Sequence, residues 1–337
     1  RYTVPNHIPP LLDVPLERVA RELSLIAPGD EENEQAAEAA ALGEQIRGMQ
    51  VGMHDFLTMS LPDFVYWFDR DGRERRDVVL NAVPVAVGPT LRELLFSGRV
   101  PVIVTSATLA VRGDMTYFRR RIGAEEVEEL ILDSPFDFER QVTLYIPQDM
   151  PSPKEEYAFL PAACEAIRRF VEQTDGRAFV LFTSYRMMHD VAADMQEFFD
   201  EAKLYLMVQG EGLSRTRMLD RFRSDVRSVI FGTASFWTGV DVPGEALSNV
   251  TIVKLPFAVP DHPLTAARSE AVEKEGLSSF RHYSLLEAIL RFRQGFGRLI
   301  RSREDKGIVV VLDNRIVRTS YGRAFLESVP PCRVVYF

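Results

Sequence analysis

The sequence predicts a doubly wound α/β fold, in which helices cover both faces of a mostly parallel sheet. From about residue 100 onward, short apolar runs rich in Val, Ile and Phe alternate with amphipathic stretches. The runs are apolar throughout, which is typical of strands buried on both faces. The stretches between them, such as EAIRRFVEQ at 165–173, repeat apolar residues at three and four positions, as a helix requires. With 337 residues and 46% hydrophobic content, the chain can bury a full core and is expected to form about two domains.

Two elements precede this pattern. Residues 31–60 predict one long helix that is acidic at its start, as the helix dipole favours. FVYWF and VVLNAVPV then flank the turn-like RDGRER, which predicts a β-hairpin. The expected strands of the sheet are PVIVTSA (101–107), TLYIP (143–147), AFVLFTS (178–184), LYLMVQ (204–209), SVIFGT (228–233), VTIVKL (250–255), IVVVLD (308–313) and CRVVYF (332–337).

Composition and charge exclude several classes of protein. Only Cys164 and Cys332 occur, so the chain can build neither a disulfide framework nor a Cys-x-x-Cys metal site. Its five histidines show no ligand spacing, and we therefore expect no metal site. The net charge of −9 argues against a general polyanion binder, so any nucleic acid must meet a local basic patch.

Targeting signals are not found in the sequence. No apolar run approaches the roughly 20 residues that cross a bilayer, and the start RYTVPNHIPP lacks a charged-then-apolar signal pattern. We expect no membrane partner and a cytoplasmic location, in the cytosol or nucleoid of a bacterium. Because the chain begins at Arg1 instead of a methionine, we expect it to be a piece of a longer protein.

QGFGRLIRS, at 294–302, places two glycines in a stretch that otherwise predicts a helix. Gly295 and Gly297 would each cost about 1 kcal/mol relative to alanine in a helix interior. A solvated helix face is the common origin of a charge run. Residues 291–303, however, contain five arginines and no acid, so their charges repel unless an anion lies among them. Arginine forks suit phosphate oxygens, so this face is predicted to receive a phosphate. The polar residues within about 80° of one another on the predicted helix are Glu287, Arg291, Gln294, Arg298 and Arg301.

GTASFWTGVDVPG, at 232–244, follows an expected strand and so lies at the carboxyl edge of the sheet, where α/β folds bind ligands. Asp241 beside Gly239 could accept a hydrogen bond from a sugar hydroxyl, and Phe236 and Trp237 could stack on a base. The alternative is a Gly/Pro-rich loop whose tryptophan fills the core. TSATL, at 105–109, also ends an expected strand with hydroxyl groups.

Taken in order, these segments resemble the motifs of the DinG/XPD family of superfamily 2 DNA helicases. The resemblance covers about residues 79–315. The matching segments are TSATL (105–109) with motif III, FVLFTSYRMM (179–188) with motif IV, GTASFWTGVDVPG (232–244) with motif V, KLPFAVPDHP (254–263) with the element just after it, and QGFGRLIRSREDKGIVVVLDNR (294–315) with motif VI.

The resemblance implies two RecA-like motor lobes, ATP with Mg²⁺ bound between them, and 5′ to 3′ movement on single-stranded or forked DNA. The residues that it assigns to the triphosphate are Arg298, Arg301 and Gln294. Those that it assigns to ATP binding and coupling are Gly239, Asp241, Ser106 and Thr108. Those that it assigns to the DNA path are Thr183, Ser184, Tyr185, Ser235, Phe236, Trp237 and Lys254.

Several family features are missing from the chain. It has no G-x-x-x-x-G-K-[ST] phosphate loop, no Asp-Glu-x-His box and no four cysteines for an iron–sulfur cluster. In the family these motifs precede motif III, so we expect a C-terminal portion that is inactive alone. Its expected partner is the N-terminal motor lobe of the same protein, which would bind ATP and Mg²⁺ for the most part. Thr238 stands where many relatives carry an acid.

The expected organisation is a helical arm at 1–75, the returning part of an arch-like insertion, then a closing segment of the first motor lobe at 76–125, and the second RecA-like lobe at 126–337. An alternative is a non-catalytic nucleic-acid-binding or regulatory module derived from a helicase lobe. An unrelated α/β hydrolase is disfavoured, because no G-x-S-x-G elbow occurs.

Overall fold

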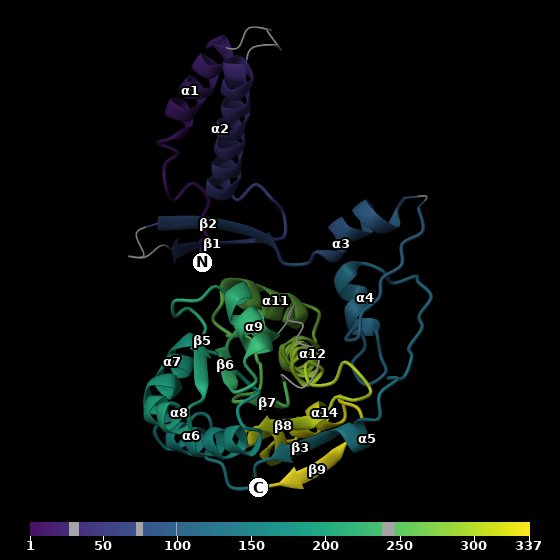
Figure 1. Ribbon diagram of the computed structural model, residues 1–337. Coiled ribbons are helices and arrows are strands. Elements are labelled where there is room, and N and C mark those ends of the chain that lie inside the picture. Colours follow the sequence, from purple (N-terminus) through teal and green to yellow (C-terminus); the bar gives the residue numbers. More distant parts are fainter. Residues whose placement is uncertain (27–33, 72–76, 99, 238–246) are drawn as a thin grey trace. The chain divides into compact units, whose positions relative to one another are not determined.

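The computed structural model describes residues 1–26, 34–71, 77–98, 100–237 and 247–337 (Figure 1). The chain divides into two compact units. Unit 1 comprises residues 1–91 and 259–279, and unit 2 comprises residues 92–258 and 280–337. Among the described helices, none combines the length and the apolar character that a membrane span needs.

Unit 1 is built on an antiparallel hairpin of β1 (Phe64–Asp71) and β2 (Asp77–Pro84). Successive side chains of a strand point to opposite faces. Tyr66 therefore clusters with Phe56 of α2 (Glu34–Thr58), whereas Trp67 clusters with Ala267 of α11 (Pro263–Lys274). The predicted hairpin and the predicted long helix are both confirmed. Two further helices of this unit, α1 (Asp13–Ile26), which packs along α2, and α3 (Gly88–Leu91), are not among the predicted elements.

Unit 2 contains a seven-stranded sheet. Its strands are β3 (Val142–Ile146), β4 (Ala178–Leu181), β5 (Tyr205–Val208), β6 (Ser228–Gly232), β7 (Asn249–Ile252), β8 (Gly307–Val311) and β9 (Arg333–Tyr336). Their order in the sheet is β5-β6-β4-β7-β8-β3-β9, and every neighbouring pair is parallel. The α/β class and seven of the eight expected strands are thereby confirmed.

Helices cover both faces of this sheet, so it is doubly wound (Figure 1). Alternate residues of one strand enter different cores: Phe179 lies in the core under α9 and α12, and Val180 lies in the core under α6, α7 and α8. The helices of unit 2 are α4 (Thr116–Ile122), α5 (Phe138–Gln141), α6 (Glu156–Gln173), α7 (Tyr185–Asp194), α8 (Gln196–Ala202), α9 (Arg215–Ser224), α10 (Ala234–Trp237), α12 (Leu285–Phe296), α13 (Arg315–Arg318) and α14 (Gly322–Leu326), with π-helical turns η1 (Arg92–Phe96) and η2 (Phe280–Ser284).

One expected strand is wrong. Residues 101–106, from the run PVIVTSA, have no regular secondary structure, and the Ile103 side chain is 89% exposed. A strand needs backbone hydrogen-bond partners on a neighbouring strand. Within the part of the chain that the structure describes, no strand pairs with these residues.

Candidate functional site

Polar side chains gather where the parallel strands of unit 2 end. Because all seven strands run in the same direction, their carboxyl ends meet at one edge of the sheet, which is where open α/β sheets bind ligands. The residues that follow the strands there are Ser152 and Lys154 after β3, Thr183, Ser184 and Tyr185 after β4, Gln209 after β5, Thr233 and Ser235 after β6, Lys254 after β7, and Asp313 and Arg315 after β8.

The segment after β4 is open to solvent. Ser184 is the N-cap of α7, and its Oγ accepts a hydrogen bond from the backbone N–H of Met187 at 3.3 Å. Thr183 and Tyr185 on either side of it are exposed, Tyr185 to 53%. The helix N-terminus and the hydroxyl groups can therefore meet an anion from solvent.

The segment after β6 is closed. Phe236 and Trp237 are 0% and 4% exposed, and the indole Nε1 of Trp237 donates to the carbonyl of Phe182 at 3.1 Å. The expectation that these two rings stack on a base is therefore corrected: they fill the core. The Oγ of Ser235 is buried and has no hydrogen-bond partner among the described residues. Gly239 and Asp241, together with Thr238, lie outside the described residues.

Two glycines make room for these rings. A Cβ on Gly232 would lie 2.6 Å from the ring of Phe236, and a Cβ on Gly295 would lie 3.0 Å from the ring of Trp237. Real Cβ atoms rarely come closer than about 3.4 Å to a neighbour, so only glycine fits here without displacing a ring. Gly295 is therefore explained by close packing.

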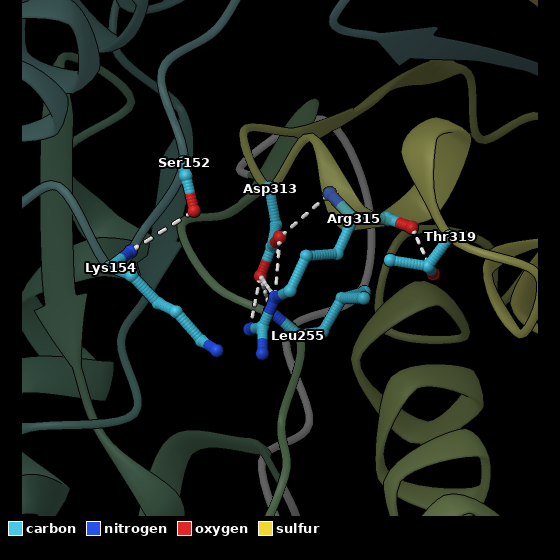
Figure 2. A network of polar contacts seen from close by, with 6 residues as sticks. All are labelled: Ser152, Lys154, Leu255, Asp313, Arg315 and Thr319. Carbon is cyan, nitrogen blue, oxygen red and sulfur yellow. Dashed lines mark hydrogen bonds and ion pairs between the residues drawn. The ribbon is translucent and has the colours of Figure 1, made fainter.

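A buried ion pair fixes the segment after β7 to the segment after β8 (Figure 2). The carboxylate of Asp313 is fully buried and accepts hydrogen bonds from the Leu255 N–H at 2.8 Å and from Arg315 Nη2 at 2.5 Å. The guanidinium of Arg315 also lies over the ring of Phe257, 5.4 Å from its centre. Leu255 follows Lys254, so this network determines where Lys254 is presented.

Lys254 is a partly buried cation. Its ammonium group lies 5.5 Å from the centre of the Phe159 ring. Burial is the main cause that lowers the pKa of Lys254, with Arg315 contributing, whereas the carboxylates of Glu156 and Asp313 raise it. A cation in such surroundings gains stabilisation when a further anion arrives.

The predicted helix through QGFGRLIRS is wrong beyond Phe296. α12 ends there, and the backbone N–H of its C-cap, Gly297, donates to the carbonyl of Arg293. Arg298 and Arg301 therefore lie in the turns after the helix and do not continue its face. Gly297 is a helix end, so the cost of a glycine in a helix interior does not apply to it.

The two arginines after α12 are held by main-chain contacts. Nε and Nη2 of Arg298 donate to the carbonyl of Trp237 at 3.1 and 2.7 Å. The backbone N–H of Arg301 donates to the carboxylate of Asp305 at 2.7 Å. Burial lowers the pKa of both guanidinium groups; Arg215 lowers that of Arg298 further, and Asp305 opposes the effect on Arg301.

The TSATL segment (105–109) contacts α12 (Leu285–Phe296). Gln294 Nε2 donates to Thr108 Oγ1 at 3.4 Å, and the guanidinium of Arg293 donates to the carbonyls of Ala110 and Ala107. Ser106 is exposed, and its Oγ accepts from the N–H of Thr108 at 3.3 Å. The structure thus brings Thr108 and Gln294 together, 186 residues apart in the chain.

Glu287 joins α12 to α4 and was not predicted as a site residue. Its carboxylate accepts a hydrogen bond from the Tyr117 hydroxyl at 2.7 Å and forms an ion pair with Arg121, both on α4. It also lies 3.8 Å from the guanidinium of Arg291, so the arginine face does have an acidic partner. No local pattern could have paired residues that lie about 170 positions apart in sequence.

Gln209, Asp313 and Arg315 are further residues of this edge that were not predicted. A polar residue directly after an apolar run was their available signal, since each follows a strand of the sheet. No group of three or more potential metal ligands occurs within residues 1–26, 34–71, 77–98, 100–237 and 247–337.

The chain is similar to known helicases. Residues 167–332 match the family described as the helicase C-terminal domain. The ATP-dependent DNA helicase YoaA of Escherichia coli K12 is 38% identical over 270 residues, which are 80% of this chain and 41% of that protein. The 3′-5′ exonuclease DinG of Bacillus subtilis is 34% identical over 278 residues, 81% of this chain and 30% of that protein.

The fold has a counterpart among solved structures. The structure XPD_APO superimposes with a TM-score of 0.60 at 17% identity, over 95% of this chain and 72% of that one. At this identity the likeness concerns the fold alone. The chain spans less than half the length of the two curated relatives above, and the matching domain is a C-terminal one. The sequence matches show that the chain belongs to the DinG/XPD family of helicases and corresponds to a C-terminal portion of such a protein.

Proposed function

We propose that this chain is the C-terminal motor portion of an ATP-dependent DNA helicase that moves 5′ to 3′ on single-stranded DNA. In this proposal the chain supplies arginines to an ATP site shared with a first motor lobe and forms part of the DNA path. The division into a helical arm at 1–75, a closing segment of the first lobe at 76–125 and a second lobe at 126–337 belongs to the same proposal. A cytosolic or nucleoid location would follow from it.

One observation carries the proposal: Thr108 of TSATL and Gln294 of QGFGR are hydrogen-bonded at 3.4 Å, with Arg298 and Arg301 just beyond. Thr108 and Gln294, which the family resemblance assigns to the nucleotide, thus come from distant segments and meet in unit 2, and Arg298 and Arg301 follow Gln294 closely in the chain. Arginines lose little by burial if they meet a triphosphate, whose oxygens match their donors. Their role would be to stabilise the charge that develops on the transferring phosphate.

The residues present fit a nucleotide in part. The guanidinium groups of Arg298 and Arg301, with pKa values lowered by burial, are suited to polyphosphate oxygens. Among the described residues no carboxylate cluster is suited to Mg²⁺, so we assign the metal ion to the first lobe. ATP, when bound, would supply the phosphoryl group that is transferred to water.

The DNA path is proposed to follow the open part of the sheet edge. Thr183, Ser184 and Tyr185 present two hydroxyls, a helix N-terminus and an exposed ring. Lys254 adds a positive charge for a backbone phosphate, whereas Ser235, whose Oγ is buried in the closed segment after β6, is left out of this path. Because the net charge of the chain is −9, such a local path is needed to bind a polyanion.

The exposure of the apolar run at 101–106 supports the proposal that this chain contacts a first motor lobe. Val102, Ile103 and Val104 are 41%, 89% and 45% exposed, although their sequence is that of a buried strand. Such a run becomes buried if a neighbouring parallel strand pairs with it. We propose that the first motor lobe provides that strand.

The test is the ATPase activity of this chain beside a protein extended N-terminally by the first lobe, each with and without single-stranded DNA. DNA-stimulated turnover is expected only in the extended protein. If the extended protein does not hydrolyse ATP while this chain binds single strands, the motor function is contradicted and a non-catalytic binding module takes its place.

A further inference from the structure

Gln209 joins two segments of the sheet edge through the oxygen and the nitrogen of its side-chain amide. Its Oε1 accepts hydrogen bonds from the backbone N–H of Thr233 at 2.8 Å and from the Thr233 hydroxyl at 3.0 Å. Its Nε2 donates to the hydroxyl oxygen of Tyr185 at 2.5 Å. The backbone N–H of Gln209 donates to the carbonyl of Phe231 at 3.0 Å, so its main chain is fixed to β6 as well.

The orientation of this amide is determined by chemistry. A backbone N–H can only donate, so the oxygen of the amide must face Thr233 and its amino group must face Tyr185. Thr233 is 4% exposed, and turning the amide around would leave its buried N–H without an acceptor. The bond from Gln209 to Tyr185 is therefore enforced by the bond from Thr233 to Gln209.

The ring of Tyr185 is supported although it is exposed. It stacks on the ring of His189, with centroids 6.4 Å apart and 22° between the planes. The Nδ1 of His189 lies 2.8 Å from a carboxylate oxygen of Glu211. An exposed side chain held at its far end has lost its conformational freedom before a ligand arrives, which increases affinity.

Gln209 also lies between the two proposed sites. Thr233 directly precedes α10, and α10 ends at Trp237, whose carbonyl accepts the hydrogen bonds of Arg298. On the other side, Gln209 contacts Tyr185 of the proposed DNA path. A shift of α10 would therefore reach Tyr185 through one amide.

We propose that Gln209 is a positioning residue, which holds Tyr185 for contact with single-stranded DNA and couples it to the segment after β6. This inference rests on the proposed function, since it requires Tyr185 to contact DNA. Gln209 itself needs no contact with DNA, because its effect passes through the tyrosine hydroxyl.

The test is a double-mutant cycle in the full-length helicase, read out as the Kd for a fluorescent oligothymidylate. Tyr185→Ala is expected to raise Kd about 5-fold to 100-fold, the loss of one stacked base. Gln209→Met is expected to raise Kd about 3-fold to 10-fold, the loss of one net hydrogen bond. In the Tyr185→Ala background, Gln209→Met should change Kd by less than about twofold, because the residue through which it acts is gone.

A second readout separates positioning from general damage. The DNA concentration that gives half-maximal ATPase stimulation should rise with Kd, while the KM for ATP stays unchanged. Tyr185→Phe removes the hydroxyl and leaves the bonds of Thr233 intact, so it should reproduce the Gln209→Met effect even where the latter variant folds poorly. Tyr205→Ala is the matched control, a 44% exposed tyrosine at the opposite end of β5, and should leave Kd unchanged.

Two outcomes would overturn the inference. The first is that Gln209→Met and Tyr185→Phe both leave Kd unchanged while Tyr185→Ala weakens binding. The second is that the effects of Gln209→Met and Tyr185→Ala multiply in the double variant. If Tyr185→Ala itself leaves DNA binding intact, the assignment of Tyr185 to the DNA path fails, and this result differs from both.

Discussion

The stretches FTSYR (182–186) and TASFW (233–237) follow the neighbouring strands β4 and β6, and both combine Thr and Ser with aromatic residues, yet the rings of Tyr185 and Trp237 have opposite surroundings. Tyr185 is 53% exposed, whereas Trp237 is 4% exposed. The difference lies in the residues that face them. Gly232 and Gly295 leave room for Phe236 and Trp237, whereas the hydroxyl of Tyr185 is held at the surface by Gln209. An aromatic residue at a sheet edge thus indicates stacking on a base only if no glycine opposite it makes room in the core.

The largest effect should come from Arg298, whose guanidinium group donates to the carbonyl of Trp237. Arg298→Ala in the full-length helicase is expected to lower ATP turnover by about 10³-fold or more, because such an arginine stabilises the transferring phosphate. The affinity for single-stranded DNA should change by less than about threefold. Arg303→Ala is the matched control, since Arg303 is an exposed arginine of the same turns. Equal turnover of the two variants would contradict the assignment.

The next largest effect sharpens the comparison itself. Trp237→Ala is expected to lower the free energy of unfolding by about 3 to 5 kcal/mol, as truncation of a buried aromatic does. Tyr185→Ala should change it by less than about 0.5 kcal/mol, because its ring is exposed. Urea denaturation measures both. If Trp237→Ala instead leaves stability intact and weakens DNA binding, Trp237 stacks on a base, and the contrast between a buried Trp237 and an exposed Tyr185 is contradicted.

The two glycines provide a graded test. Gly232→Ala is expected to cost about 2 kcal/mol of stability, because its Cβ would lie 2.6 Å from the Phe236 ring. Gly295→Ala should cost less, about 1 kcal/mol, since its Cβ would lie 3.0 Å from Trp237 and alanine favours the helix. The midpoint of thermal unfolding gives the order. The reverse order would show that the rings repack easily.

The smallest effect is expected for Lys254, which follows β7 at the sheet edge. Lys254→Ala is expected to weaken binding of single-stranded DNA by about 1 kcal/mol and to reduce the slope of log K against log salt by about 0.7, the loss of one phosphate contact. Equilibrium titrations between low and moderate salt measure the slope. Lys306→Ala, at an exposed lysine before β8, should leave it unchanged.

Local sequence patterns predicted the elements that depend on local periodicity. The structure confirms the hairpin, the seven strands that follow from apolar runs, and the long helix predicted over 31–60, which is found as Glu34–Thr58. The strand predicted at 101–107 is not formed, because a strand needs a hydrogen-bonded neighbouring strand and the described residues provide none for it. The helix predicted through QGFGRLIRS is wrong beyond Phe296, because α12 ends there with Gly297 as its C-cap. The sequence alone does not show whether a glycine lies inside a helix or at its end.

The candidate site was predictable in part. Side chains directly after strands, such as Thr183 and Lys254, could be placed at the sheet edge because parallel strands end together. Partners that come from remote segments could not: Glu287 meets Tyr117 across 170 residues, and Gln209 meets Tyr185 across 24. The burial of Trp237 depends on Gly295, which belongs to another helix.

The end of α12 at Phe296 has an electrostatic consequence for the arginines that follow it. The carbonyls of the last turn give a helix C-terminus a partial negative charge of about half an elementary unit, which stabilises nearby cations. Arg298 and Arg301 follow directly, and Arg301 Nε lies 3.4 Å from the carbonyl of Arg298. Main-chain carbonyl oxygens thus accept hydrogen bonds from both guanidinium groups. Unlike a carboxylate, a peptide dipole carries no net charge, so these main-chain contacts orient the two side chains without themselves neutralising them.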